Sequence, residues 1–107
     1  LIWDMSDLDE PILVKEFYLD SSASDHNLYI KGNLMYQSNY QAGLRILDIT
    51  DPENPVEVGH FDTAPNADDV KGFGGSWSNY PYFKSGIIAV SSQGEGLYLL
   101  RKREVDL

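Results

Sequence analysis

The sequence predicts an all-β fold, a β-propeller-type array of four-stranded antiparallel blades, and three observations support this prediction. First, residues 2–17 recur at 46–61 with a shift of 44, and a period of roughly 40–50 residues is the length of one propeller blade. Second, Gly, Pro, Asn and Asp punctuate the chain roughly every 8–12 residues, which is typical of short strands joined by turns. Third, no segment shows a convincing helical periodicity.

The repeat aligns residue by residue. At the shift of 44, six positions are identical, namely Ile2/Ile46, Asp4/Asp48, Asp7/Asp51, Pro11/Pro55, Val14/Val58 and Phe17/Phe61. A weaker repeat, at a shift of 53, joins residues 28–47 to 81–100. Because a closed propeller needs about four to eight blades, we expect this chain to be an incomplete piece of about two and a half blades. The alternative is a small complete β domain that contains a duplication.

On this basis the chain divides into three parts of a single propeller fragment. Residues 1–20 are expected to end one blade, residues 21–63 to form a complete blade, and residues 64–107 to supply an enlarged loop and three strands of the next blade. The expected strands, in order, are residues 1–6, 11–18, 26–31, 34–40, 43–50, 56–61, 80–83, 87–92 and 96–101.

Local patterns justify these elements. Residues 43–50 carry apolar side chains on both faces, as expected for a strand that is covered on both sides. The turn at 51–55 contains two prolines and an Asx acceptor, so it does not continue a central strand. Residues 56–61 alternate and include a charge, which suits a partly solvated outer edge. The apolar run 87–90 is the pattern of a strand buried on both faces.

The shift grows from 44 to 53 because the segment 62–79 is longer than its counterpart at 20–26. This segment is rich in Gly and polar residues, and we expect an enlarged loop there. Both segments lead into an innermost strand. We therefore expect both loops on one face of the array, near the central channel.

Charge and composition argue against several classes of partner and site. The net charge of −9 argues against a nucleic-acid partner, which needs a positive protein surface, and disfavours anionic membrane surfaces. The chain has no cysteine, so neither a disulfide nor a thiolate metal site is available. No apolar run reaches the roughly 20 residues of a membrane span, and no signal peptide is visible.

One segment resembles a known repeat. Residues 44–55 run from an apolar strand through Asp48 to Thr50, Asp51, Pro52 and Pro55, and this order is similar to the LVIVD repeat. Residues 1–11 are a second copy, with Leu8 in place of the first proline, and residues 96–101 are a truncated third copy.

With the runs 23–34, 37–40 and 75–77, the chain resembles the C-terminal propeller region of the choice-of-anchor B proteins. This resemblance implies a secreted or cell-surface β-propeller and supplies no catalytic residues.

Six residues form the predicted ligand-binding set, namely His26, Asn27, Asp68, Asp69, Trp77 and Tyr80. Trp77 and Tyr80 lie in a dense aromatic segment and would anchor a protein or a carbohydrate. For Trp77 the alternative is a plug between blades. His26, at the mouth of an innermost strand, would contribute a polar contact, and hydrogen bonding to loop backbone is the alternative.

No catalytic residue, metal ligand or cofactor is assigned. Asp62, Asp68 and Asp69 lie in a Gly-rich acidic loop, where a calcium ion is one alternative because carboxylates can ligate calcium. The loop lacks the alternating oxygen ligands and the terminal Glu of an EF-hand, so a solvated loop is preferred. No Gly-x-Ser-x-Gly elbow is present.

We therefore expect an extracellular or cell-surface interaction scaffold that binds a protein or a carbohydrate through loops on one face, with the remaining blades of its parent chain as further partners. Two alternatives stay open. One is a structural subunit of a larger extracellular assembly, packed through open strand edges such as 56–61. The other is a hydrolase or lyase with its site in the propeller channel, because the fold alone does not decide the chemistry.

Overall fold

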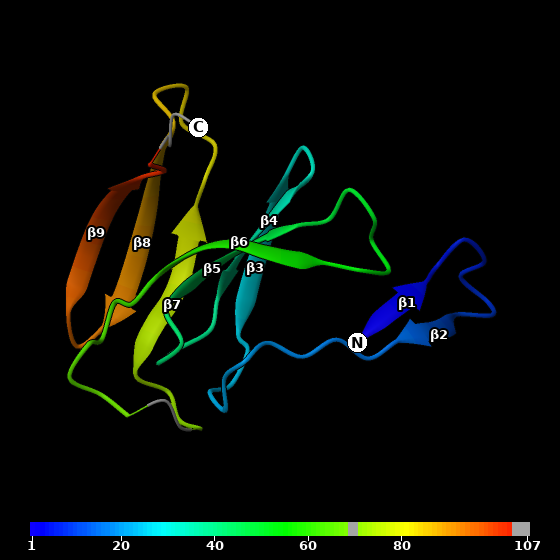
Figure 1. Cartoon of the computed structure of the whole chain (residues 1–107), viewed down its shortest axis with the longest axis horizontal. Helices are drawn as coiled ribbons and strands as arrows, with labels where there is room; N and C mark the ends of the chain where they lie inside the picture. Colours follow the sequence, from blue (N-terminus) through cyan, green and yellow to red (C-terminus); the bar gives the residue numbers. More distant parts are fainter. Residues whose placement is uncertain (69–70, 104–107) are drawn as a thin grey trace.

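The computed structural model describes residues 1–68 and 71–103, and its regular structure there consists of β-strands (Figure 1). The strands are β1 (Ile2–Asp4), β2 (Ile12–Lys15), β3 (Asn27–Lys31), β4 (Leu34–Ser38), β5 (Leu44–Asp48), β6 (Val56–Phe61), β7 (Gly75–Tyr80), β8 (Ile87–Gln93) and β9 (Gly96–Arg101). They form three antiparallel sheets of neighbouring strands, β1-β2, β3-β4-β5-β6 and β7-β8-β9. The all-β, blade-like architecture expected from the sequence is confirmed.

The repeat at the shift of 44 is also a repeat of structure. In the β5-β6 pair, Ile46 lies opposite Gly59 and Asp48 opposite Val56, with a register shift after Ile46. In the β1-β2 pair, Ile2 lies opposite Lys15 and Asp4 opposite Ile12, with the register shift after Ile2. The two hairpins therefore share their register and the position of their bulge.

Side-chain hydrogen bonds explain why the hairpins need their aspartates. The Asp48 carboxylate accepts hydrogen bonds from the Thr50 N–H at 2.8 Å and from the Thr50 hydroxyl at 2.7 Å. Asp4 accepts the same two bonds from Ser6, at 2.9 and 2.6 Å. These bonds stabilise the ionised carboxylates, with the hydroxyl bond as the main cause, and they lower the pKa of both aspartates from the ordinary value of 3.8.

The first strand of the last sheet corrects the sequence prediction. We expected it at 80–83, but β7 ends at Tyr80, so the enlarged loop ends at residue 74 and residues 75–79 are strand. In the innermost strands, Tyr80 of β7 lies opposite Ala89, just as Tyr29 of β3 lies opposite Tyr36. Strand β3 therefore aligns with β7 through a shift of 51 residues. The pair β4-β5 aligns with β8-β9 through a shift of 53. Pro81 has no N–H to donate to a ladder, which favours an end of the strand at Tyr80.

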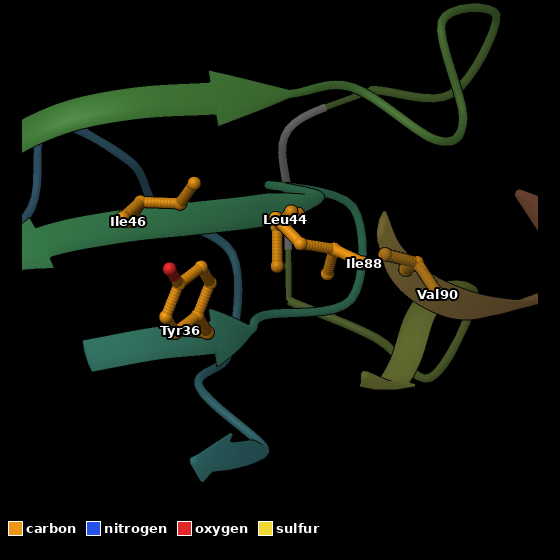
Figure 2. Close-up of a cluster of buried hydrophobic side chains, with 5 residues drawn as sticks. All are labelled: Tyr36, Leu44, Ile46, Ile88 and Val90. Carbon is orange, nitrogen blue, oxygen red and sulfur yellow. The ribbon is translucent and has the colours of Figure 1, made fainter. Parts of the chain in front are cut away.

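The core lies between the second and third sheets. Its buried side chains are Tyr36, Leu44 and Ile46 from β4-β5 and Ile88 and Val90 from β8 (Figure 2). Within this interface, the Asn79 amide donates to the Tyr36 carbonyl at 3.1 Å and to the Ser38 hydroxyl at 2.9 Å. The two blades are therefore held together by apolar packing and by a buried polar contact.

A backbone bridge also joins these two sheets. The Tyr40 N–H donates to the Ser76 carbonyl at 2.9 Å, and the Ser76 N–H donates to the Tyr40 carbonyl at 2.8 Å. Tyr40 is in the left-handed region, with φ of 48°, which is uncommon for a residue with a side chain. Gly75 has φ of 88°, and a Cβ there would lie 2.3 Å from the Tyr40 carbonyl oxygen, so this approach requires glycine.

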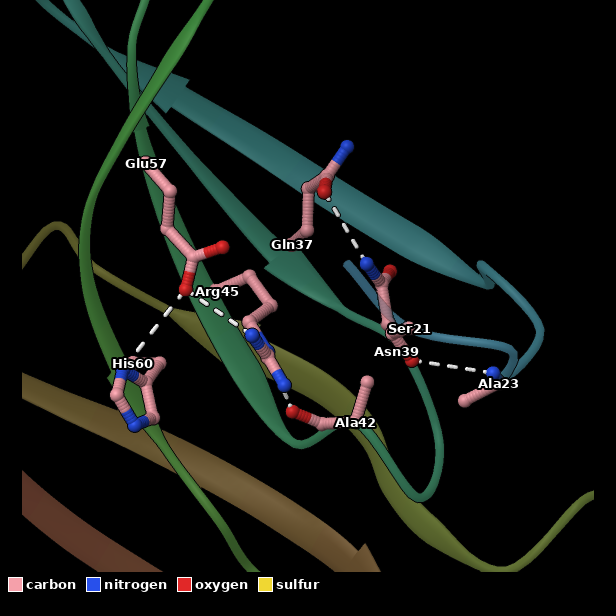
Figure 3. Close-up of polar contacts among 8 residues, drawn as sticks. All are labelled: Ser21, Ala23, Gln37, Asn39, Ala42, Arg45, Glu57 and His60. Atoms are coloured by element: carbon pink, nitrogen blue, oxygen red, sulfur yellow. Dashed lines mark hydrogen bonds and ion pairs between the residues drawn. The ribbon is translucent and has the colours of Figure 1, made fainter. Parts of the chain in front are cut away.

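The outer strand β6 is the solvated edge that its alternating pattern predicts. Glu57 on β6 accepts a hydrogen bond from the Arg45 guanidinium at 3.0 Å, and His60 Nδ1 lies 3.8 Å from the same carboxylate oxygen (Figure 3). The Arg45 Nε also donates to the Ala42 carbonyl at 2.7 Å. These contacts tie the last two strands of the complete blade to the turn before β5.

Candidate binding site

The most distinctive site is a group of rings at the joint between the second and third sheets, which we call the aromatic cluster: His26, Tyr40, Phe73 and Trp77. The Trp77 ring lies 4.4 Å from the His26 ring and 5.8 Å from the Tyr40 ring, between centroids. His26 also meets Tyr40 edge-on at 4.6 Å, and Phe73 meets Tyr40 at 5.6 Å. Tyr40 is thus the centre on which the other three rings pack.

The backbone bridge explains this arrangement. Because Tyr40 and Ser76 exchange two backbone hydrogen bonds, Trp77 is fixed beside Tyr40. Trp77 also lies at the bulge of β7, where the register shifts between Ser76 and Ser78. Bulges re-aim side chains at strand ends and near functional sites. Here the bulge lies where the Trp77 ring meets the rings of His26, just before β3, and Tyr40, just after β4.

The cluster has a buried base and an exposed surface. Tyr40 is buried, whereas 75% of Phe73 and 44% of Trp77 remain exposed, and His26 is exposed as well. Rings that are packed on one side and open on the other lose little conformational entropy when a ligand covers them. The cluster therefore has the geometry of a rigid aromatic platform.

A groove with both apolar and polar lining residues borders the segments that carry this platform. Its volume is about 410 Å³, and its lining includes Asp25, Asn39 and Lys71, each next or close in sequence to a member of the aromatic cluster. Glu16 adds a second carboxylate to the lining. Asn39 donates a hydrogen bond from its amide to the Gln37 side chain at 3.1 Å, which fixes its orientation (Figure 3).

The structure brings some of the predicted site residues together. His26 and Trp77 belong to the aromatic cluster. Asn27 lies next to it and donates from its amide to the Ser78 hydroxyl at 3.1 Å, so this side chain links β3 to β7. These three residues come from two predicted loops that are about 50 residues apart in the sequence.

The other predicted residues lie elsewhere. Tyr80 packs against a second aromatic group, with ring distances of 5.4 Å to Tyr82 and 4.8 Å to Phe83. Asp68 is exposed and makes no hydrogen bond or ion pair within the part of the chain that the structure describes. Asp69 lies outside the described residues. The polar residues that line the groove, Asp25, Asn39, Lys71 and Glu16, were not among the predicted binding residues.

Two members of the cluster were also missed as site residues. Phe73 was not among the predicted binding residues, and Tyr40 was expected only as the end of a strand. The available signal for Phe73 was an aromatic residue in a Gly-rich loop. Tyr40 carries no such signal, because its role depends on a pairing with Ser76, 36 positions further along the chain.

The described residues contain neither a group of metal ligands nor a membrane-spanning helix. Across residues 1–68 and 71–103, no three His, Asp or Glu side chains gather into a group that could hold a metal ion. Nor does any helix in the described part of the chain have the length and apolar character needed to cross a membrane.

The fold and its residue-by-residue repeat define a protein built from blade-type antiparallel sheets. More specifically, residues 24–63 match the LVIVD repeat, so this chain contains an LVIVD repeat. The match includes the whole four-stranded sheet β3–β6. No curated protein matches the chain, and neither does any solved structure.

Proposed function

We propose that this chain is an extracellular or cell-surface binding module that holds a carbohydrate on the aromatic cluster. The observation that carries the proposal is the half-open platform, in which Phe73 and Trp77 stay exposed while buried Tyr40 fixes them from below. The proposed location follows from the resemblance to choice-of-anchor B propellers.

The platform suits a flat ligand with an apolar face. Aromatic rings contribute large contact areas and, when they are already packed, need little ordering on binding. A sugar ring presents such a face on its C–H side and hydroxyl groups around its edge. The Phe73 and Trp77 rings would contact the face.

The groove beside the platform would contact the hydroxyl groups. Carboxylates accept hydrogen bonds from hydroxyls, and Asp25 and Glu16 both line the groove. Lys71 supplies a donor in the same lining. A few fixed polar groups next to an apolar surface are the usual arrangement for orienting a small ligand.

The proposal is tested on an array of immobilised glycans. We expect the wild-type chain to bind a subset of them, and we expect Phe73→Ala and Trp77→Ala each to weaken that binding about tenfold or more, as for a central aromatic anchor. Phe83→Ala is the matched control, because its ring is also about half exposed but belongs to the other aromatic group. Circular dichroism and the unfolding midpoint establish that each variant is folded.

Trp3 and Trp77 are the two tryptophans of the chain. In a Trp3→Phe background, a change in fluorescence on titration with a bound glycan therefore reports on Trp77 itself. If the folded Phe73→Ala and Trp77→Ala variants bind glycans as strongly as the wild type does, the proposal is contradicted. A folded chain that binds no glycan would overturn the carbohydrate assignment and favour a protein as the ligand.

A further inference from the structure

A basic loop joins β7 to β8 at residues 81–86, at one end of the third sheet. Lys84 lies in this loop and is exposed. Arg101, the last residue of β9, lies beside the loop, because its guanidinium donates a hydrogen bond to the Ser85 carbonyl at 3.0 Å. Two cations therefore flank this end of the sheet.

Contacts with β3 hold the loop against the second sheet. The Tyr82 hydroxyl donates a hydrogen bond to the Ile30 carbonyl at 2.6 Å, and the Lys31 ammonium donates to the Pro81 carbonyl at 3.3 Å. These contacts fix the loop and bring a third cation to it. We call the three cations the basic tip: Lys31, Lys84 and Arg101.

The basic tip lies at an end of the sheets and not on one of their faces, so a sheet packed alongside does not cover it. The turn at residues 31–33 illustrates this, because it stays exposed although the third sheet packs against the second. Figure 1 shows this turn and the β7–β8 loop at the same end of their sheets.

The repeat places the opposite charge at this end of the other hairpins. Through the shift of 53, Arg101 corresponds to Asp48, which in turn corresponds to Asp4 through the shift of 44. Both aspartates accept hydrogen bonds from a Ser or Thr two residues later, whereas Arg101 donates to the neighbouring loop. The third sheet therefore has a guanidinium where the other two hairpins have a carboxylate.

The cations of the basic tip have no carboxylate partner. The chain has 17 Asp and Glu residues and 8 Lys and Arg residues, yet none of the three forms an ion pair within residues 1–68 and 71–103. An ammonium has three N–H donors and a guanidinium has five. In this part of the chain Lys31 and Arg101 each use one donor, so the others are available to an anion.

A hollow of about 410 Å³ at the basic tip is lined by Ser85, Gly86, Arg101 and Lys102. With four lining residues it is short, so it suits the side chains of a peptide better than a long acidic polysaccharide, which needs an extended row of cations. A guanidinium also matches a carboxylate, because the two groups form parallel hydrogen bonds. We infer that the basic tip binds an acidic segment of a partner protein, with one carboxylate on Arg101 and further carboxylates near Lys31 and Lys84.

Fluorescence anisotropy with a labelled oligoglutamate peptide tests this binding. We expect the chain to bind the peptide, and to bind it less tightly as the salt concentration is raised, because salt screens exposed charges. An oligoglutamine peptide of the same length should not bind, because it lacks the charges.

Lys84→Glu is the most direct variant, because Lys84 makes no hydrogen bond or ion pair in the described part of the chain, so its replacement breaks no contact there. We expect it to weaken peptide binding about tenfold or more, since it sets like charges against each other. Lys15→Glu is the matched control, because Lys15 is an exposed lysine on β2, away from the basic tip, and its replacement changes the net charge equally (Figure 1). Its affinity should stay within about twofold of the wild type.

Two further variants locate the site. Arg101→Gln should also weaken binding about tenfold, because glutamine keeps a donor for the loop carbonyl but lacks the charge. Trp77→Ala should bind the peptide as the wild type does, which separates this site from the aromatic cluster.

Equal losses in Lys84→Glu and Lys15→Glu would overturn the inference, because they would show an effect of net charge alone. A chain that does not bind oligoglutamate would overturn it as well. If dextran sulfate binds through Lys84 while the peptide does not, the occupant is an acidic polysaccharide and the assignment to a protein segment is wrong.

Discussion

The hairpins β1-β2 and β5-β6 have nearly the same local structure and very different surroundings. They share their register, their bulge and the two hydrogen bonds that a carboxylate accepts from a Ser or Thr two residues later. Yet Leu47 in β5 is 0% exposed, whereas Trp3, its counterpart in β1, is 47% exposed. Residues that are close in sequence therefore make the hairpin, while the neighbouring sheets decide whether it is buried.

The difference extends to the polar contacts. In β5-β6, Arg45 and Glu57 are partly buried and paired, whereas β1-β2 has Leu1 and Leu13 at these positions. A contact also reaches from one hairpin to the other, since the Lys15 ammonium donates to the Asn54 side chain at 2.6 Å. Both groups are exposed, and such surface contacts typically contribute less than about 1 kcal/mol. We therefore expect β1-β2 to be only loosely attached to the second sheet.

The largest expected effect comes from truncating the two equivalent side chains. Leu47→Ala should lower the free energy of unfolding by about 2–5 kcal/mol, because it leaves a cavity at a fully buried position. Trp3→Ala should lower it by less than about 1 kcal/mol, because the ring is half exposed. Urea unfolding at low protein concentration measures both values, and equal losses would show that the two hairpins are equally embedded.

A second change should make the third sheet as loosely attached as the first. Gly75→Ala places a Cβ against the Tyr40 carbonyl at a positive φ, and such strain costs about 1–3 kcal/mol. Gly94→Ala is the control, because it also has a positive φ but its added Cβ meets no atom within 4 Å. Hydrogen exchange should become faster in β7 for Gly75→Ala than for Gly94→Ala, and identical exchange would contradict the role of the bridge.

A smaller effect is expected on the pH dependence of folding stability. The pKa values of Asp4 and Asp48 are lowered in the folded hairpins, so the stability they contribute is present above the ordinary value of 3.8 and is lost as the pH falls through the folded value. We expect Asp48→Ala to be destabilising at pH 7 and to approach the wild type at an acid pH below the lowered pKa of Asp48, where the carboxylate is protonated.

Thermal unfolding at the two pH values measures this convergence. Asp4→Ala should show the same trend in the local exchange of β1-β2 but a smaller change in the global transition. A difference between Asp48→Ala and the wild type that is independent of pH would mean that the charge of the carboxylate does not matter.

The smallest effect has the opposite sign. Leu8 occupies the place of Pro52 in the repeat, in a turn where the Glu10 N–H donates to the Asp7 carbonyl at 3.2 Å. Leu8→Pro should stabilise the β1-β2 hairpin by about 0.4–1 kcal/mol, because it restricts the unfolded chain. Slower amide exchange in β1-β2 measures the gain, and faster exchange would show that the turn at Leu8 differs from that at Pro52.

Much of the fold could be predicted, because the hairpin signals are local. The Asp-x-Thr-Asp-Pro pattern at 48–52 fixes a turn through contacts between residues two or three positions apart, and eight of the nine strands lie in segments where the sequence placed them. The strand expected at 80–83 was placed wrongly because the shift of 53 was applied to the innermost strand as well, although the connection between β7 and β8 is longer than that between β3 and β4. Nothing in that segment revealed the two additional residues between β7 and β8.

The candidate site could be predicted only in part. Trp77 and His26 were selected because an aromatic and a histidine lay in loops that lead into innermost strands. Asp25 and Lys71, which line the groove, were not selected, since nothing in the sequence places these two residues, 46 positions apart, in the same lining.

The sequence by itself determined the blade unit, its turns and its repeat, because those features depend on backbone dihedrals and hydrogen bonds between near neighbours. Only the tertiary structure decided that Tyr40 lies beside Trp77 and that Leu44 is buried while Leu97 is exposed. These outcomes depend on which sheet lies next to which, because burial is a property of the neighbouring surface and not of the residue that it covers.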